Sequence, residues 1–297
     1  MKKILITGAG SYIGRSFEKY IGQWSDKYSV DTVDMIDGSW REKDFRGYDV
    51  VFHVAGIAHA DVGYASDETK KKYYTINTEL TVETAKKAKK NGVKQFIFMS
   101  SAIVYGESAP MGKYKIITKE TKPEPANFYG DSKLQAENGI NPLSDESFKV
   151  VVLRPPMIYG KGSKGNYPML VKMARKLPVF PNVKNQRSML YVGNLCEFIK
   201  LMIDNEEAGI FHPQNSEYVS TSEMVRQIAN VHGKKIWITK LLNPLVWLVS
   251  KVPGKIGGLA NKAFGNFAYD MGMSEYGECK YNIVDFGETI MKTEGEN

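Results

Sequence analysis

Three glycines at the end of an apolar run near the amino terminus constrain the fold of this chain more than any other feature. Ile4–Thr7 has the composition of a short buried strand, and a helical pattern begins soon after it. Gly8, Gly10 and Gly14 mark the junction, with the spacing G-x-G-x-x-x-G. Gly8 suits a tight turn, Gly10 lets the backbone approach a diphosphate, and Gly14 lets helix and strand pack closely. The segment therefore predicts a strand–turn–helix unit that binds a dinucleotide.

Short apolar runs alternate with helical patterns through the rest of the first half. The runs are rich in Val, Ile and Phe and cover Tyr28–Val33, Asp49–Val54, Gln95–Met99 and Lys149–Leu153. Between them, Tyr12–Trp24 and Thr75–Asn91 place apolar residues at helical spacing. Strands without polar alternation are typical of a parallel sheet covered on both faces, and strands that alternate with helices indicate βαβ units. We therefore expect an α/β fold with a Rossmann-type doubly wound parallel sheet.

The pattern changes after the pair Pro155-Pro156. A glycine-rich stretch follows, and then come shorter elements, namely helices at Tyr167–Lys176, Val192–Asp204 and Ser222–His232 and a strand at Ile210–Phe211. We expect residues 1–156 to form an NAD-binding domain that carries the catalytic residues. Residues 157–297 are expected to form a smaller mixed α/β region that binds the substrate, with some of its elements returning to the first domain.

Composition narrows the choice of partners. The net charge is +7, a mild excess that fits an anionic small molecule or a well-solvated surface. No basic cluster is interleaved with aromatic residues, so we expect no nucleic acid partner. The two cysteines, Cys196 and Cys279, form no CxxC motif, and the four histidines lack metal-ligand spacing. We therefore expect a reduced, cytoplasmic protein without a metal site.

No apolar run approaches the roughly 18 residues of a membrane-spanning helix, so we expect no integral membrane segment. The longest candidate, Leu241–Val252, is interrupted by Asn243, Pro244 and Ser250. We expect an amphipathic core helix in this segment, and a helix that lies on a membrane surface is the alternative.

An acid after the second apolar run favours NAD over NADP as the cofactor. Asp34 stands twenty residues after Gly14, where a carboxylate would accept hydrogen bonds from the adenosine ribose. It would repel the 2′-phosphate of NADP. Ser11, Tyr12 and Ile13, which open the helix after the glycine turn, would present backbone N–H groups to the diphosphate. A merely solvated strand end is the alternative for the acid.

Hydroxyl groups and a lysine stand where a catalytic site would form. Ser100 and Ser101 follow the run Gln95–Met99, at the end of a strand that faces the ligand in such folds. Tyr129 and Lys133 are four residues apart in the next helical pattern and so share one face. A lysine ammonium beside a phenol lowers the pKa of the phenol from about 10 toward neutrality, which suits a general acid or base at a carbinol carbon. Such pairs usually face solvent, but this one follows a nucleotide-binding turn and a strand that ends in serines.

The chain resembles the extended short-chain dehydrogenase/reductase family, in particular its NAD-dependent nucleotide-sugar epimerases, dehydratases and reductases, with UDP-glucose 4-epimerase as an example. The resemblance covers about residues 1–215 and rests on motifs in the family's order, which are Thr7–Gly14, His53–Gly56, Tyr73–Asn77, Ser100–Gly106, Tyr129 with Lys133, and Leu153–Pro156. One departure is Ser11, where many members have glycine. The segment beyond residue 215 matches only loosely.

The resemblance implies a role for each matching residue. Ser101 would hydrogen-bond the sugar O4, Tyr129 would exchange the O4 proton, and Lys133 would hold the nicotinamide ribose. The residues that would line the cofactor are Ala55, Gly56, Asn77, Ser100 and Pro156. Asn166 and Arg187 would contact the diphosphate of the nucleotide sugar, as guanidinium geometry suits, with a surface salt bridge as the alternative for Arg187. The family also implies a homodimer that forms through two helices.

Three functions remain open on the sequence alone. The first is C4 epimerisation of a UDP-hexose or UDP-N-acetylhexosamine through a 4-keto intermediate, with a bound NAD that is regenerated. The second is an NAD(P)H-dependent reductase of a UDP-4-keto-6-deoxy-hexosamine, which would use the same residues and which the short chain favours. A noncatalytic NAD-binding regulator is a remote third, because Tyr129 and Lys133 are both present. A dehydratase is disfavoured, since Ala102-Ile103 follow Ser101 where acids would be expected.

Overall fold

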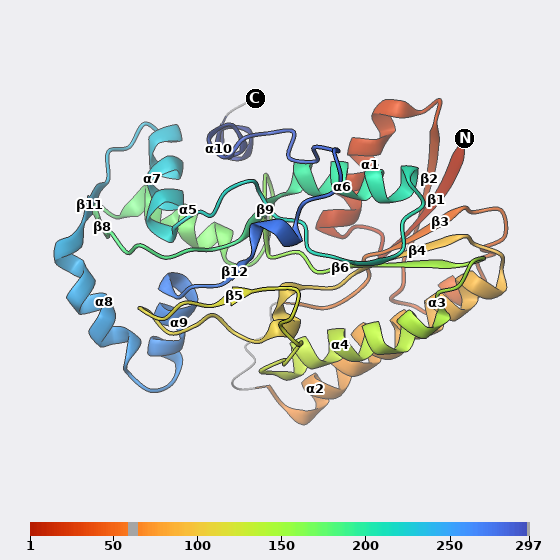
Figure 1. Cartoon of the computed structure of the whole chain (residues 1–297), viewed down its shortest axis with the longest axis horizontal. Helices are drawn as coiled ribbons and strands as arrows, with labels where there is room; N and C mark the ends of the chain where they lie inside the picture. The colour runs from red at the N-terminus through yellow and green to blue at the C-terminus, as the bar shows by residue number, and fades with distance from the viewer. Residues whose placement is uncertain (59–64, 296–297) are drawn as a thin grey trace. The chain divides into compact units, whose positions relative to one another are not determined.

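The computed structural model describes residues 1–58 and 65–295, which form two compact units (Figure 1). The first unit comprises Met1–Gly106, Pro123–Pro155 and Leu195–Pro213. The second unit comprises Glu107–Lys122, Pro156–Asn194 and Gln214–Asn297. The chain therefore passes between the units several times. Residues 107–122 belong to the second unit, although their place in the sequence suggested the first domain.

The first unit is built on a six-stranded parallel sheet in the order β10-β6-β4-β3-β1-β2. The strands are β1 (Lys2–Thr7), β2 (Tyr28–Val33), β3 (Val50–His53), β4 (Gln95–Met99), β6 (Lys149–Leu153) and β10 (Gly209–Phe211). They confirm the five predicted strands of the first half and the predicted strand near Phe211. Because β1 lies between β2 and β3, the winding reverses beside β1, and ligands bind at such a switch point.

Helices cover both faces of this sheet (Figure 1). On one face lie α3 (Leu80–Lys90) and α4 (Phe128–Ile140), and on the other lie α1 (Tyr12–Ile21) and α6 (Val192–Asp204). Side chains alternate along the strands, so that Leu5, Val51 and Phe96 pack in one core with α3 and α4. On the opposite face the ring of Phe17 meets Phe52 edge-on at 5.2 Å between centroids. Burial of a side chain of this size contributes about 1.5–3 kcal/mol.

The helix predicted at Thr75–Asn91 is longer and less regular than its apolar spacing suggested. It begins with α2 (Asp67–Tyr73), continues through a π-helical turn, η4 (Tyr74–Glu79), and ends as α3. The π turn surrounds Asn77, whose buried side chain faces the loop after β3. An extra residue in one turn does not disturb the apolar pattern enough to be visible in a sequence, and such turns are frequent at functional sites.

The second unit contains short parallel strand pairs and a helical layer. The pairs are β7 (Met157–Tyr159) with β9 (Met189–Tyr191), β8 (Val179–Pro181) with β11 (Trp237–Thr239), and β5 (Ile116–Ile117) with β12 (Ala268–Tyr269). The helices are α5 (Tyr167–Lys176), α7 (Thr221–Val231), α8 (Asn243–Ser250), α9 (Lys255–Phe264) and α10 (Phe286–Glu294). The predicted helices are confirmed here to within a residue at each end. Pairing of β5 with β12 explains why residues 107–122 join this unit.

The apolar segment Leu241–Val252 is not the core helix that its composition suggested. It forms a 3-10 turn and the short helix α8, and Leu241, Leu245 and Leu248 are 78%, 59% and 59% exposed. The expectation of a core helix was therefore wrong. Among the helices of the described residues, none has the length and apolar character needed to cross a membrane.

Candidate active site

Neighbouring strands of the first unit end at paired residues. The residues that follow the strands therefore lie along the same edge of the sheet. Thr7 pairs with Val33 on one side and with His53 on the other. Further along the sheet, Met99 pairs with Leu153. The predicted residues that come directly after these strand ends, or two to three residues later, are Gly8, Gly10, Asp34, Ala55, Gly56, Ser100 and Ser101. The structure therefore places them along the carboxyl edge of one sheet.

The glycine turn after β1 is closely packed at one glycine and open at the next. Gly8 and Gly10 have φ of +87° and +79°, in the left-handed region that favours glycine. A Cβ at Gly8 would lie 2.9 Å from the backbone of Ala55, whereas a Cβ at Gly10 would meet nothing within 4 Å. At Gly14 a Cβ would lie 2.6 Å from the hydroxyl oxygen of Ser11. The turn thus combines close packing on one side with an open approach at Gly10.

Helix α1 begins at this turn with its amino end free of acidic side chains. Ser11 caps the helix and accepts the N–H of Gly14 at 3.1 Å. Tyr12 and Ile13, both half-buried, form the first turn, which contains no acid. The positive end of the helix dipole is therefore not compensated by a carboxylate, and an anion is favoured there. These residues fit the diphosphate of a dinucleotide.

Asp34 lies beside the glycine turn. The N–H of Gly8 donates to the carbonyl of Val33 at 2.9 Å, which brings the next residue, Asp34, to the same edge. The Asp34 carboxylate is exposed and accepts a backbone N–H two residues further on at 2.9 Å. The other acids of this segment are engaged with side chains, because Asp31 accepts a tyrosine hydroxyl and Asp37 a serine hydroxyl. The serine bonds also hold the pKa of Asp37 below its usual value.

Asn77 fixes the loop after β3 against helix α4. Its Oδ1 accepts the N–H of Ile57 at 2.9 Å, and its Nδ2 donates to the Ile57 carbonyl and to the Ser132 hydroxyl, both at 3.1 Å. Gly56 lies in the same loop, and a Cβ there would be 3.1 Å from Asn77 Oδ1 and 3.2 Å from Lys133 Nζ. Absence of a side chain at Gly56 therefore leaves room for the lysine ammonium.

A buried chain of side chains joins the end of β1 to the helix of Asn77. Thr81 donates its hydroxyl to the Asn77 carbonyl at 2.8 Å and must then accept from His53 Nε2, 3.0 Å away. His53 Nδ1 accepts the hydroxyl of Thr7 at 2.7 Å. Burial lowers the pKa of His53 to about 3, so the ring is neutral and structural.

Tyr129 and Ser101 lie together at the carboxyl edge. The side chain of Asn127 accepts the N–H of Tyr129 at 3.1 Å, which caps α4 and places the phenol in its first turn. Ser101 begins the 3-10 helix Ala102–Tyr105, and a hydrogen bond with this hydroxyl lowers the pKa of Tyr129. Burial has the larger effect and raises that pKa to about 12. The phenol therefore holds its proton at neutral pH.

Lys133 follows Tyr129 by one turn, but its ammonium is directed to the backbone. Its Nζ donates to the carbonyl of Met99 at 2.9 Å and lies 4.7 Å from the centre of the Phe98 ring. Burial lowers the pKa of Lys133 to about 8. Lys133 is not among the groups that shift the pKa of Tyr129 here, because desolvation of the phenol dominates.

A buried ion pair behind Lys133 was missed by reasoning from the sequence. Glu137 lies one turn further along α4, and Arg154 Nη2 contacts its carboxylate at 2.5 Å. The Ser100 hydroxyl donates to the same carboxylate. Arg154 also donates to the hydroxyl of Tyr105 at 2.6 Å. The negative charge of Glu137 opposes the fall in the Lys133 pKa. The spacing of Tyr129, Lys133 and Glu137 on one helix face is a signal that could have pointed to Glu137, though not to its partner.

The remaining predicted residues belong to the second unit. Pro156 is buried at its start, and Asn166 is exposed just before α5. Arg187 Nη1 donates to the carbonyls of Lys262 and Gly265 at 2.8 and 3.1 Å, and burial lowers its pKa to about 10. Within residues 1–58 and 65–295, no carboxylate pairs with Arg187, so the surface salt bridge considered above is not found.

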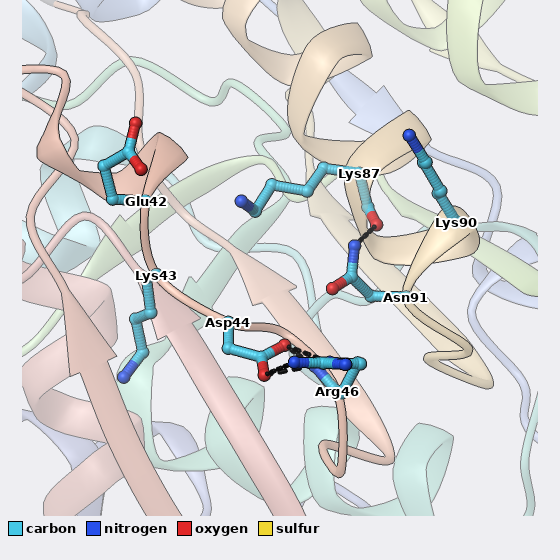
Figure 2. A pocket seen from close by; sticks show the side chains of 7 residues that line it. All are labelled: Glu42, Lys43, Asp44, Arg46, Lys87, Lys90 and Asn91. Atoms are coloured by element: carbon cyan, nitrogen blue, oxygen red, sulfur yellow. Dashed lines mark hydrogen bonds and ion pairs between the residues drawn. The ribbon is translucent and has the colours of Figure 1, made fainter.

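A charged hollow of about 470 Å³ in the first unit is separate from these residues (Figure 2). It is lined by Glu42, Lys43, Asp44, Arg46, Lys87, Lys90 and Asn91. These residues precede β3 and β4, so the hollow lies at the amino edge of the sheet. Asp44 and Arg46 form an ion pair of 2.7 Å in it (Figure 2). Its position away from the carboxyl edge excludes it as the site of the glycine turn.

Comparison with known proteins places the chain in a family. The model of the NAD dependent epimerase/dehydratase family matches residues 4–212. The chain belongs to this family. It is 34% identical over 259 residues to a UDP-glucose 4-epimerase of Vibrio cholerae, covering 80% of this chain and 77% of that protein. The family resemblance expected from the sequence motifs is therefore confirmed.

A second relative and a solved structure are also similar to this chain. The N-acetyl-alpha-D-glucosaminyl-diphospho-ditrans,octacis-undecaprenol 4-epimerase of Escherichia coli O157:H7 is 30% identical over 279 residues, or 85% of this chain and 81% of that protein. The solved structure of UDP-glucuronic acid 4-epimerase from Bacillus cereus in complex with NAD has a TM-score of 0.73 and 17% identity, covering 98% of this chain and 97% of that one. This likeness confirms the Rossmann-type α/β fold.

Proposed function

We propose that this protein is an NAD-dependent epimerase that inverts C4 of a sugar carried on a diphosphate, with a UDP-hexose or UDP-N-acetylhexosamine as substrate. The observation that carries the proposal is the contact of the Tyr129 phenol with the Ser101 hydroxyl at the sheet edge that also bears the glycine turn. Both curated relatives are named as 4-epimerases of sugars joined to a diphosphate. Membership in the family supports NAD as the cofactor.

The residues of the first unit support acid–base chemistry at O4. Ser101 would hydrogen-bond O4 and orient it toward Tyr129, which would act as the phenolate, take the O4 proton to become the phenol, and later return that proton. NAD, when bound, supplies a hydride acceptor and a positive charge that lowers the pKa of the phenol. Asp34 binds the adenosine ribose hydroxyls, and the turn from Gly8 to Gly14 holds the diphosphate. Lys133, kept in place by Met99, binds the nicotinamide ribose.

Residues of the second unit supply the substrate contacts in this proposal. Arg187 is half-buried, has no acidic partner among the described residues and donates to two carbonyls, which leaves its charge available to a diphosphate. Asn166, exposed before α5, provides a second polar contact. Ala55 and Pro156 complete the apolar lining of the cofactor. We further infer a cytoplasmic homodimer, formed through the helical layer of α3 and α4.

The test is to identify the cofactor released when freshly purified protein is denatured, and to follow C4 inversion without added cofactor. We expect NAD near one equivalent per chain and conversion of UDP-glucose or UDP-N-acetylglucosamine to its C4 epimer by NMR. A polyprenyl-diphosphate-linked N-acetylglucosamine, the substrate class named for the Escherichia coli relative, is assayed in parallel. The alternative outcome is a protein that is purified without bound cofactor and oxidises NADPH or NADH in the presence of a UDP-4-keto-6-deoxy-hexosamine. This result would contradict the epimerase proposal and support the reductase.

A further inference from the structure

Helices α8 and α9 of the second unit form a hairpin (Figure 1), and many of the large apolar side chains in and beside it are exposed. Its large apolar side chains are between 45% and 78% exposed, and they are Leu241, Leu245, Trp247, Leu248, Val252, Ile256 and Leu259. These seven residues define the hairpin face. Soluble proteins usually expose such side chains singly, and a contiguous group marks a surface that is covered in use.

The hairpin is an ordered part of the second unit. Asn243 Nδ2 donates to the carbonyl of Asn182 at 2.9 Å, which ties the start of α8 to the strand segment beside it. Asn261 on α9 donates to the carbonyl of Ser250 and accepts the N–H of Met111, both at 2.9 Å. These hydrogen bonds fix the hairpin to the rest of the second unit, while the side chains of the hairpin face remain exposed.

The charged residues of the segment that contains the hairpin are all lysines. The segment Gly233–Tyr269 contains no Asp or Glu, and its lysines are Lys234, Lys235, Lys240, Lys251, Lys255 and Lys262. These six lysines account for all but one unit of the net charge of +7 on the chain. Lys251 Nζ lies 5.4 Å from the centre of the Trp247 ring, so cation and aromatic group occupy the same part of the surface.

We propose that the hairpin face docks on an anionic lipid bilayer. Leucines and a tryptophan inserted at the headgroup level, with lysines beside them, are the features of a helix that lies in the plane of a membrane. Helix α8 has 8 residues and α9 has 10, so neither can cross a hydrocarbon core of about 30 Å at about 1.5 Å per residue. A symmetric contact with a second copy is disfavoured, because it would place lysines against lysines with no acid in the segment to pair them.

The proposal is tested by sedimentation of the full-length protein with lipid vesicles. We expect little binding to phosphatidylcholine alone and strong binding when about one quarter of the lipid is phosphatidylglycerol, with release at about 0.5 M salt. Leu245→Glu with Leu248→Glu is expected to weaken partitioning by at least about tenfold, since each buried leucine contributes a factor of this size. Met291→Glu, at a residue 64% exposed on α10, is the matched control and should bind as wild type does.

A second pair of variants separates charge from apolar contact. Lys251→Glu with Lys262→Glu should lower binding to the anionic vesicles, whereas Lys172→Glu on α5, also exposed, should not. Circular dichroism and thermal unfolding verify that each variant is folded. Failure of the wild-type protein to bind anionic vesicles overturns the proposal. So does a concentration-dependent dimer in analytical ultracentrifugation that Leu248→Glu abolishes, because the hairpin face is then occupied by a second copy.

Discussion

The carboxyl edge of the first unit and the hairpin face of the second depart from ordinary protein composition in opposite ways. At the edge, Lys133, Glu137 and Arg154 are charged groups that are at least 94% buried, and each has a partner. On the hairpin face, Leu245 and Leu248 are apolar groups that remain exposed. Buried charge and exposed apolar surface both cost stability unless something compensates them. The buried charges at the edge are compensated by partners within the chain. The exposed apolar side chains of the hairpin face require a partner outside the chain.

Substitution of Tyr129 should produce the largest effect on activity. Tyr129→Phe removes the only atom of this side chain that exchanges a proton, so turnover should fall by about a thousandfold, in the range for loss of a general acid or base. The cofactor content should stay unchanged, because the ring still packs against Tyr73 at 5.8 Å between centroids.

The matched control for this variant is Tyr20→Phe. Tyr20 lies on α1 and donates its hydroxyl to Glu197 at 2.6 Å, away from the carboxyl edge. Turnover in Tyr20→Phe should be near that of the wild type. Near-normal turnover in Tyr129→Phe would contradict the assignment of the phenol to proton exchange.

Neutralising Glu137 should have the largest effect on stability. Glu137→Gln leaves the Arg154 guanidinium buried without its counter-charge, and loss of one partner of a buried pair costs about 3 kcal/mol or more. Urea unfolding measures this loss. Glu146→Gln, at an exposed carboxylate, should change the free energy of unfolding by less than about 0.5 kcal/mol. Equal stability of the two variants would mean that the ion pair is not desolvated.

The stability contributed by Lys133 should increase as the pH rises. Burial lowers the pKa of Lys133 from 10.5 to about 8, so the folded protein releases this proton before the unfolded chain does. Between these two values the unfolded state binds more protons, and folding becomes more favourable with increasing pH. Other groups titrate in the same range, so the quantity to measure is the difference in unfolding free energy between wild type and Lys133→Met. That difference should move in favour of wild type from about pH 8 to about pH 10.

Reasoning from the sequence reached the carboxyl edge because its determinants are local. Gly8, Ser101 and Tyr129 each follow or begin an element whose apolar pattern is strong, so their positions along one sheet edge follow from the parallel order of the strands. The partner of Glu137 could not be found in this way, because Arg154 lies 17 residues away, directly after β6. Whether the pKa of Tyr129 rises or falls depends on how deeply the phenol is buried. The spacing of residues on a helix face does not reveal that burial.

The hairpin face was misjudged for a similar reason. Apolar composition in Leu241–Val252 predicts burial, but it does not say whether the chain itself provides the covering surface. Short helices such as α8 are also below the length at which a periodic pattern separates two faces. The expectation of a core helix did not use the distribution of charge, although six lysines without an acid in Gly233–Tyr269 are visible in the sequence.

The smallest predicted effect is a change in the free energy of unfolding at the hairpin face. It best distinguishes this face from the core of the first unit. Leu248→Ser should change the free energy of unfolding by less than about 0.5 kcal/mol, because this side chain is already 59% exposed in the folded protein. Leu5→Ala, at a fully buried leucine of the first unit, should cost about 3 kcal/mol. Both are measured by urea unfolding without lipid. A loss for Leu248→Ser as large as that for Leu5→Ala would show that the protein covers the hairpin face itself, and no surface would then remain for a bilayer.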